Sequence, residues 1–264
     1  DPISKYLDDS WIDKYIGDKI SIHHLLTHTS GLGDYFNEKF ANYSRDQVRV
    51  IEDFKPFIDD SLAFSPGTRF QYSNSGFLLL GAIIENITQD SYFNFIKSNI
   101  TDKLGMKNTG FYEMDSPVEN LAIGYTWSPN EYGYQSNMLM HVVKGGPAGG
   151  GYSTLNDLCK FSAALMNHEL LSQQQLDKLL TPHQELPGQM KTGSGYTHYG
   201  YGMMVRKDSS KSQLNFGHLG GFPGISSGMS VELNSGFTVI TLSNYDLWGN
   251  YLNHYIRDLM LRVR

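Results

Sequence analysis

The spacing of apolar residues predicts two helices within the chain. Apolar positions recur at near-helical intervals over residues 77–87, directly after a Ser/Asn cluster that can cap the first turn. The same pattern runs over residues 155–166, where Ser153 or Thr154 is the expected cap. Both segments are long enough, and regular enough in their spacing, to favour helix over strand.

The C-terminal segment predicts the clearest amphipathic helix. Apolar residues fall there as pairs every four positions: Leu247/Trp248, Tyr251/Leu252, Tyr255/Ile256 and Leu259/Met260. The expected last turn carries Arg262 and Arg264, whose charge is the one favoured at the negative end of a helix dipole.

Strand patterns gather just before that helix. Residues 228–233 and 237–242 flank Asn234-Ser235-Gly236, a hairpin turn with glycine where a positive φ is needed. Residues 199–205 and 213–218 predict two more strands, joined by 208–211. Together these elements predict an α+β fold: a mainly helical region over 1–198, and an antiparallel sheet closed by the C-terminal helix over 199–264.

Composition narrows the classes of protein. With 21 Lys plus Arg against 27 Asp plus Glu, the net charge of −6 lacks the basic excess of a nucleic-acid binder. The longest apolar run, residues 77–84, is far shorter than the about 20 residues that span a bilayer. The one cysteine, Cys159, cannot form an internal disulfide. The chain opens at Asp1-Pro2, so we expect either a removed leader or a longer parent protein.

Several familiar motifs are absent or in the wrong context. The sequence has no Walker-type loop, no G-x-G-x-x-G and no H-E-x-x-H. The spacing of His23, His24 and His28 matches no familiar metal site, and the leucines around them favour a packed helix end. A formal G-x-S-x-G at 224–228 runs into a predicted strand instead of a helix, so Ser226 is interpreted as a strand-entry residue.

Four segments, taken in order, resemble the motifs of serine β-lactamase-related hydrolases. Residues 20–32 (ISIHHLLTHTSGL) resemble the family signature ITIRHLLTHTSGL, and residues 71–77 (QYSNSGF) look like its Tyr-x-Asn motif. Residues 216–224 (FGHLGGFPG) look like its third motif, in a His-x-Gly form instead of Lys-Thr-Gly. Residues 149–158 (GGGYSTLNDL) are similar to its AGGLYSTAEDL segment. The family includes class C β-lactamases, penicillin-binding proteins, DD-peptidases and certain esterases.

The resemblance implies roles for residues of the second motif. Taken alone, Tyr72 reads as an aromatic packing beside the helix, with Ser73 or Asn74 as its N-cap. With the flanking signature, Tyr72 is predicted to be catalytic: a phenol whose pKa is lowered by nearby cations can take a serine proton and return it to the leaving group. Asn74 would orient a substrate amide and bind the lysine that the family requires.

The third motif implies the other catalytic group. His218, otherwise an ordinary strand histidine, would face the cleft, where it would bind a substrate carboxylate or support Tyr72, with a charge that varies near neutral pH. Gly220 and Gly221 would allow close backbone approach, and the Gly221 N–H would form half of an oxyanion hole. Lys191-Thr192-Gly193 spells the family triplet literally, but its polar, Gly-rich surroundings make it a decoy.

The family nucleophile is missing from this sequence. It belongs to Ser-x-x-Lys, and no serine here has lysine three positions later. In relatives that motif precedes a DDPVSKYLP segment, which residues 1–7 resemble. We therefore expect the nucleophile helix and the first strands to lie upstream, with the strand at 237–242 left as an open edge.

These features lead to one prediction and one alternative. The leading prediction is a β-lactamase/penicillin-binding-protein-type serine hydrolase that forms an acyl-enzyme with a D-alanyl peptide, β-lactam or small ester. It would need no cofactor, would lie outside the cytoplasm by family analogy, and would be inactive as this fragment. Its expected partners are the substrate and the missing N-terminal segment, with no nucleic acid. The alternative is a catalytically dead binding or scaffold module.

Overall fold

The computed structural model describes residues 1–207, 213–246 and 248–262, and the chain divides into two units. The first unit comprises Asp1–Lys103, Thr109–Val118 and His141–Tyr152, and the second comprises Leu104–Asn108, Glu119–Met140 and Ser153–Arg264. Each unit is described by itself below. The predicted division at residue 198 stays a prediction.

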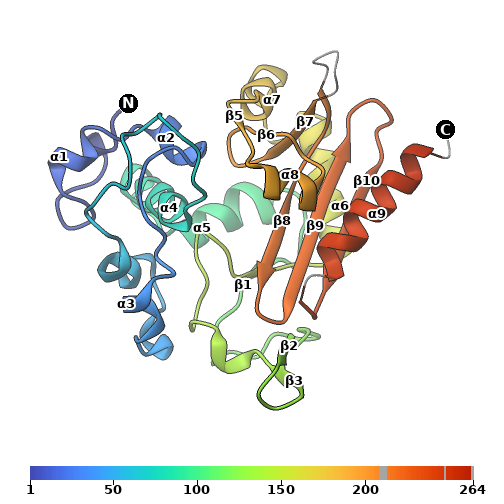
Figure 1. Cartoon of the computed structure of the whole chain (residues 1–264), viewed down its shortest axis with the longest axis horizontal. Helices are drawn as coiled ribbons and strands as arrows, with labels where there is room; N and C mark the ends of the chain where they lie inside the picture. The colour runs from blue at the N-terminus through green and yellow to red at the C-terminus, as the bar shows by residue number, and fades with distance from the viewer. Residues whose placement is uncertain (208–212, 247, 263–264) are drawn as a thin grey trace. The chain divides into compact units, whose positions relative to one another are not determined.

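The first unit is mainly helical (Figure 1). Its elements are the α-helices α1 (Lys14–Gly17), α2 (Ile22–Leu26), α3 (Glu38–Ala41), α4 (Asn74–Thr88) and α5 (Tyr92–Ile96), the short strands β1 (Gly110–Phe111) and β4 (Gly151–Tyr152), which pair antiparallel, the 3₁₀ turns Ile3–Lys5, Arg45–Gln47 and Ile51–Phe57, and the π-helical turn Lys97–Thr101.

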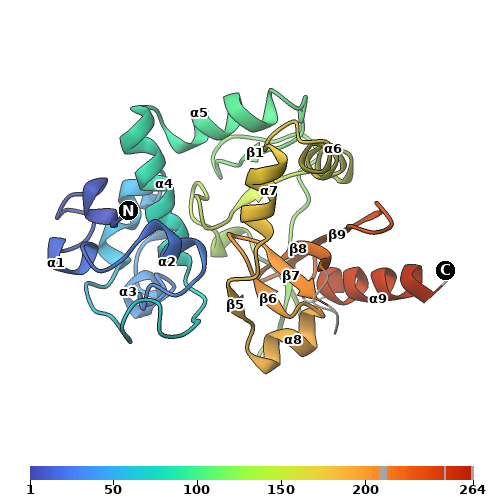
Figure 2. The ribbon, with the colours of Figure 1, turned by 90° about the horizontal axis from the view of Figure 1, so that it is seen from above.

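Helix α4 is the central element of this unit's core. It confirms the helix predicted over 77–87, and its buried face includes Leu78, Leu79 and Ile83. Gly81 lies so close to the Pro147 ring that a methyl group there would collide with it. The helix ends at Thr88, its C-cap Gln89 has a φ of 53°, and Figure 2 shows the bend from there into α5.

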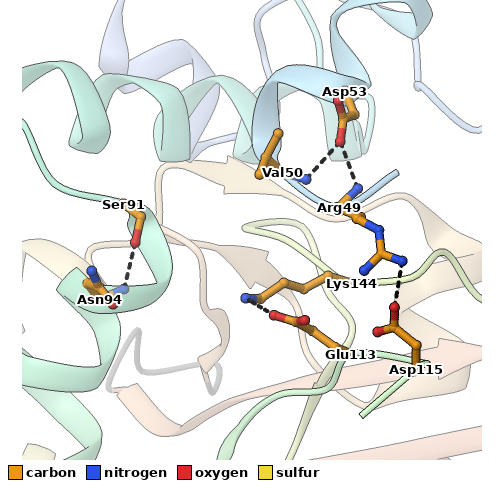
Figure 3. Close-up of polar contacts among 8 residues, drawn as sticks. All are labelled: Arg49, Val50, Asp53, Ser91, Asn94, Glu113, Asp115 and Lys144. Carbon is orange, nitrogen blue, oxygen red and sulfur yellow. Dashed lines mark hydrogen bonds and ion pairs between the residues drawn. The ribbon is translucent and has the colours of Figure 1, made fainter. Parts of the chain in front are cut away.

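Ion pairs link the two later segments of the first unit, Thr109–Val118 and His141–Tyr152, to each other and to Arg49 (Figure 3). Lys144 Nζ lies 2.7 Å from Glu113 Oε1 and 4.2 Å from the centroid of the Phe93 ring. Arg49 binds Asp115 at 2.6 Å, with both side chains about half exposed. Because Lys144 is 19% exposed, its pair is screened less by solvent than the Arg49 pair and contributes more to holding these segments together.

The second unit contains the larger sheet. Among the described residues, its strands run in the order β10-β9-β8-β7-β6-β5, and every neighbouring pair is antiparallel. The elements are the strands β2 (Tyr125–Ser128), β3 (Gly133–Ser136), β5 (Gln184–Glu185), β6 (His198–Tyr199), β7 (Met204–Lys207), β8 (Gln213–Phe222), β9 (Ile225–Glu232) and β10 (Thr238–Ser243), the helices α6 (Leu155–Met166), α7 (Gln173–Leu180), α8 (Gly188–Ser194) and α9 (Trp248–Arg262), and the 3₁₀ turn Met138–Met140.

The predicted strands are confirmed except for one. The hairpin at 234–236 joins β9 to β10, Gly236 has a φ of 71°, and β10 lies at an edge of the sheet among the described strands. The single strand expected over 199–205 is wrong, because the chain turns at Gly200–Gly202 and forms the separate strands β6 and β7. Gly202 adopts a φ of 71°, which suits a tight turn and not a strand. The predicted connection 208–211 lies outside the described residues.

Alternation along β9 gives the sheet two different faces. Val231 lies in an apolar cluster with Phe216 of β8 and Leu165 of α6, whereas Ser226, Gly228 and Ser230 lie against α9. Successive side chains of a strand point to opposite faces, so one face is apolar and the other small and polar. Helix α6 begins as predicted, with Thr154 Oγ1 accepting the Asp157 N–H.

Helix α9 contacts β9 and β10, and Figures 1 and 2 show it running along the sheet. Its buried residues are Gly249, Asn253 and Arg257, whereas the apolar pairs of the predicted stripe are exposed, with Trp248 at 61% and Tyr251 at 67%. The helix is therefore confirmed, but the apolar face is not the one that covers the sheet. Arg262 lies in its last turn; Leu247 and Arg264 lie outside the described residues.

No helix among residues 1–207, 213–246 and 248–262 combines the length and the apolar character needed to cross a bilayer.

Candidate active site

In the first unit, Tyr72 lies in the extended segment that leads into α4. The residues on either side of it both donate to His28: the Gln71 N–H to the His28 carbonyl oxygen at 2.8 Å, and the Ser73 N–H to His28 Nδ1 at 3.1 Å. The His28 ring lies against the Tyr72 ring, with centroids 4.1 Å apart and planes inclined by 33°. His28 therefore contacts the Tyr72 segment through its backbone, its ring nitrogen and its ring face.

Asp34 caps the start of α4 from outside the helix. Its Oδ2 accepts the Asn74 N–H at 2.9 Å and the Asn74 Nδ2–H at 2.8 Å. Ser73 occupies the N-cap position, but its hydroxyl donates to the Gly33 carbonyl and caps nothing, so the expected local cap is wrong. A carboxylate at this helix end also interacts favourably with the helix dipole.

The amide of Asn74 has an assigned orientation. A carboxylate can only accept hydrogen bonds, so the atom facing Asp34 must be the nitrogen, and Oδ1 is the atom with which Asn74 would bind a cation or a substrate N–H. This orientation suits the role that the family resemblance implies for Asn74.

The electrostatic surroundings of Tyr72 differ from the expectation. Its side chain is 37% exposed, but burial of the rest of the ring raises the pKa of the phenol, and the negative charge of Asp34 raises it further. The sequence analysis expected nearby cations to lower this pKa. The charge of Asp34 therefore acts on this pKa in the direction opposite to that of the expected cations.

In the second unit, His218 lies on β8, on the strand that ends at the Pro223-Gly224 turn, as predicted. Its Nδ1 is 2.7 Å from the Leu219 carbonyl oxygen, and its Nε2 is 3.0 Å from the Tyr199 hydroxyl. Because a carbonyl only accepts, Nδ1 carries the proton, and Nε2 accepts from the Tyr199 O–H. These partners assign one neutral tautomer to His218.

Burial lowers the pKa of His218, although the hydrogen bond to Leu219 acts in the opposite direction. The imidazole is therefore held neutral at pH values where an ordinary histidine begins to charge. The expected variation of its charge near neutral pH does not fit this environment. A neutral ring engaged at both nitrogens also offers no permanent cation to a substrate carboxylate.

The two glycines of the third motif differ in their surroundings. A methyl group at Gly220 would come too close to Ser227 Oγ of the neighbouring strand, so that hydroxyl would have to turn away to make room for it. At Gly221, nothing lies within 4 Å of the position that a Cβ would occupy, and the residue is exposed. Open space next to this backbone is compatible with the close approach expected of a substrate oxygen.

Two motifs that the sequence analysis set aside, the triplet at 191–193 and the G-x-S-x-G at 224–228, have partners of their own in the fold. Lys191 belongs to α8 and forms an ion pair with Glu185, whereas the family places its triplet on a strand. Ser226 is buried near the start of β9; its hydroxyl donates to the Tyr245 carbonyl and accepts the Gly249 N–H. Both placements agree with the interpretation from the sequence.

The predicted residues fall into two groups. Tyr72 and Asn74 lie together in the first unit, and His218, Gly220 and Gly221 lie together on β8 of the second.

Three interacting residues were not identified from the sequence: His28, Asp34 and Tyr199. His28 and Asp34 do lie in or just after the signature over 20–32. The sequence does carry a signal there, the unbroken polar run Thr27, His28, Thr29 and Ser30. In the structure all four residues are at most 2% exposed.

The histidines near α2 have structural partners. The Nδ1 of His24 accepts the Ser21 N–H, and the His24 N–H donates to Ser21 Oγ, which together form a capping box. Within the described part of the chain, no three His, Cys, Asp or Glu side chains are grouped so that they could hold a metal ion.

Comparison with known proteins establishes the class of this chain. A family model described as Beta-lactamase matches residues 1–259, so the chain belongs to the β-lactamase family. The resemblance drawn from the four motifs is thereby confirmed, and the α+β fold is confirmed as β-lactamase/transpeptidase-like.

Individual relatives are hydrolases and penicillin-binding proteins. The chain is 30% identical to penicillin-binding protein 4* of Bacillus subtilis, over 89% of this chain and 54% of that protein. It is similar to the crystal structure of a penicillin binding protein from Bacillus halodurans, with a TM-score of 0.86 and 30% identity over 98% of this chain and 76% of that one. A D-stereospecific amidohydrolase from Streptomyces sp. matches with a TM-score of 0.77 and 25% identity, over 96% and 76%. The chain spans about half the length of the curated relatives it matches first, 54% and 50%.

Proposed function

We propose that this chain carries the tyrosine and histidine motifs of a serine hydrolase that works through an acyl-enzyme. The observation that supports this most is the anchoring of Tyr72 and Asn74: the backbone N–H groups of Gln71, Ser73 and Asn74 hold one short segment to His28 and Asp34. Family membership supports the reaction class, since the relatives include an amidohydrolase and a D-amino acid amidase.

The reaction needs a serine that this sequence does not supply in the family motif. No serine among the 264 residues is followed by lysine at the third position, so we place the Ser-x-x-Lys pair outside them. The serine oxygen would bond to the carbonyl carbon of an amide or ester, and the amine or alcohol would leave with a proton. Water would then cleave the acyl-enzyme and release the acid while the serine regains its proton.

Tyr72 would move the protons of this cycle. Its raised pKa means that the phenol is a poor base unless a positive charge offsets Asp34 and burial. The lysine of Ser-x-x-Lys would supply that charge, with Asn74 Oδ1 accepting from its ammonium group. The 264-residue chain alone would then lack the nucleophile and the cation that activates its phenol, and would be inactive. The Gly221 N–H would stabilise the negative oxygen of the tetrahedral intermediate.

His218 narrows the substrate class. A penicillin or D-alanyl peptide presents a carboxylate, which a permanent cation binds best, and a neutral imidazole supplies none. Small esters and uncharged amides therefore fit this site better than β-lactams. We place the reaction outside the cytoplasm by analogy with the family.

A labelling experiment tests the proposal. The parent protein, extended to include an upstream Ser-x-x-Lys, is treated with a fluorophosphonate probe, alongside its Ser→Ala variant and the 264-residue chain. We expect labelling of the parent alone. Tyr72→Phe in the parent is expected to slow labelling, whereas Tyr132→Phe, at an 88% exposed tyrosine, is the matched control and should not. An upstream sequence without Ser-x-x-Lys, or labelling that survives Ser→Ala, would refute the proposal.

The absent motif also favours a second candidate, a binding module of the same fold that performs no chemistry. This module would bind a small ester or amide without turning it over. Failure of the extended protein to label or to hydrolyse esters, together with saturable binding of the same compounds, would support the module over the enzyme.

A further inference from the structure

We infer that His28 is the positioning residue of Tyr72, acting as a neutral imidazole whose unprotonated Nδ1 and ring face hold the phenol at one place. The inference rests on the proposed function only in naming Tyr72 as the group that must be positioned. The geometry that supports it lies entirely in the first unit.

The first step concerns the backbone on either side of Tyr72. The N–H groups of Gln71 and Ser73 both donate to His28, one to its carbonyl oxygen and the other to Nδ1. Two anchors that flank a residue by one position each remove most of the freedom of its φ and ψ angles. His28 thus anchors the backbone directly on both sides of the point at which the Tyr72 side chain leaves it.

The second step concerns the ring. His28 is 1% exposed, and its imidazole contacts two aromatic rings at similar tilts: Tyr72 at 4.1 Å and 33°, and Phe77 at 5.0 Å and 34°. Phe77 belongs to α4, so the imidazole transmits the position of the helix to the phenol. Aromatic pairs prefer particular ring orientations, so a change in the His28 ring is expected to be felt by both neighbours.

The third step concerns the proton on His28. A backbone N–H can only donate, so Nδ1 must present its lone pair to Ser73, and a proton of the neutral ring resides on Nε2. The tautomer is therefore opposite to that of His218, in which Nδ1 carries the proton.

The backbone of His28 is part of the same arrangement. Its φ of 55° lies in the left-handed region, which non-glycine residues adopt rarely and at a cost. This conformation directs its carbonyl toward Gln71 and its ring toward Ser73 and Tyr72 together. Glycine and asparagine tolerate the same φ, which makes them suitable replacements for separating the roles of the side chain.

Nuclear magnetic resonance of the 264-residue chain, without substrate, tests the inference. In His28→Gly the carbonyl anchor remains and the ring is lost. We therefore expect hydrogen exchange of the Ser73 amide to accelerate about tenfold, which corresponds to the loss of one buried hydrogen bond. The Gln71 amide should stay protected from exchange. Tyr72 ring resonances should move as the imidazole disappears. General destabilisation would instead accelerate exchange at both amides alike, and that result would overturn the inference.

A second variant keeps the test decisive if His28→Gly does not fold. In His28→Asn, Oδ1 stands where Nδ1 stood, so Ser73 should stay protected while the Tyr72 resonances still move. His168→Asn is the matched control, since His168 has a φ of 60° and is exposed in the second unit, and it should change neither signal. Nitrogen-15 spectra should show an unprotonated Nδ1 on His28.

Unchanged Tyr72 resonances in both His28 variants, or a protonated Nδ1 in the neutral ring, would refute the positioning role. These signals require no catalysis, so their failure would leave the proposed function untouched. Conversely, if the extended protein fails to label, the signals remain as expected.

Discussion

Replacing Asp34 tests how the start of α4 and the Tyr72 environment are coupled. The carboxylate accepts two hydrogen bonds from Asn74, at 2.9 and 2.8 Å, across 40 residues of sequence. Loss of a capping side chain costs about 0.5–2 kcal/mol, and a hydrogen bond to a charged group contributes about 1.5–3 kcal/mol. Because Asp34 is only partly buried, we expect Asp34→Ala to lower the free energy of unfolding by about 2 kcal/mol.

Asp34→Asn should cost less, about 1 kcal/mol, because its amide oxygen still accepts one of the two bonds. The variant removes the negative charge near Tyr72, so the pKa of the phenol should fall toward its ordinary value of 10.0, while burial still keeps it raised. Tyrosine carbon resonances followed against pH measure this shift directly.

Urea unfolding measures the change in the free energy of unfolding. With a slope of about 2 kcal/mol/M, Asp34→Ala should lower the midpoint by about 1 M. Asp9→Ala removes an exposed aspartate of the same unit and serves as the control, with little change expected. The reasoning fails if Asp34→Ala unfolds at the midpoint of the control, or if Asp34→Asn raises the pKa of Tyr72.

Three further predictions follow from separate contacts. Gly81→Ala should destabilise the first unit by about 1–3 kcal/mol in urea unfolding, because its methyl group collides with Pro147. Thr154→Ala should cost about 1 kcal/mol in the same assay, since the cap of α6 is lost, and Thr154→Ser should restore most of it. His218 should titrate below 6.5 in NMR spectra of the folded chain. As the pH falls below 6.5, His218 takes up its proton in the unfolded chain before it does so in the folded chain. The contribution of this residue to the free energy of unfolding is therefore complete above pH 6.5 and decreases as the pH falls toward the lowered pKa of the folded state. A His218 titration midpoint at or above 6.5 would contradict this.

Periodic patterns in the sequence were sufficient to predict most of the larger elements. The helices over 77–87 and 155–166 and the hairpin at 234–236 arise from local spacing and from one glycine with a positive φ, so a short window contains the information. The strand expected over 199–205 failed because its alternating aromatic residues masked Gly200 and Gly202, which turn the chain.

The candidate site was predictable only in part. Motif resemblance named Tyr72 and His218, but burial shifts the pKa of both groups, and spacing reveals neither that burial nor the partners that come from distant parts of the sequence. Asp34 acts on Tyr72 across the sequence, and Tyr199 reaches His218 from another strand. The cap of α4 was expected from Ser73 or Asn74 for the same reason, since a local polar side chain is visible in the sequence and a distant carboxylate is not.

The attachment of α9 to its sheet has a consequence for how that helix can move. Ser230 Oγ donates to Asn253 Oδ1 at 2.6 Å and accepts from the Tyr196 hydroxyl, while Asn253 Nδ2 donates to the Val239 carbonyl. Hydrophobic contact tolerates sliding and rolling because it has no preferred angle, whereas these bonds each demand a direction. These bonds therefore fix the rotation of the helix about its own axis, and at that rotation its apolar side chains face the solvent.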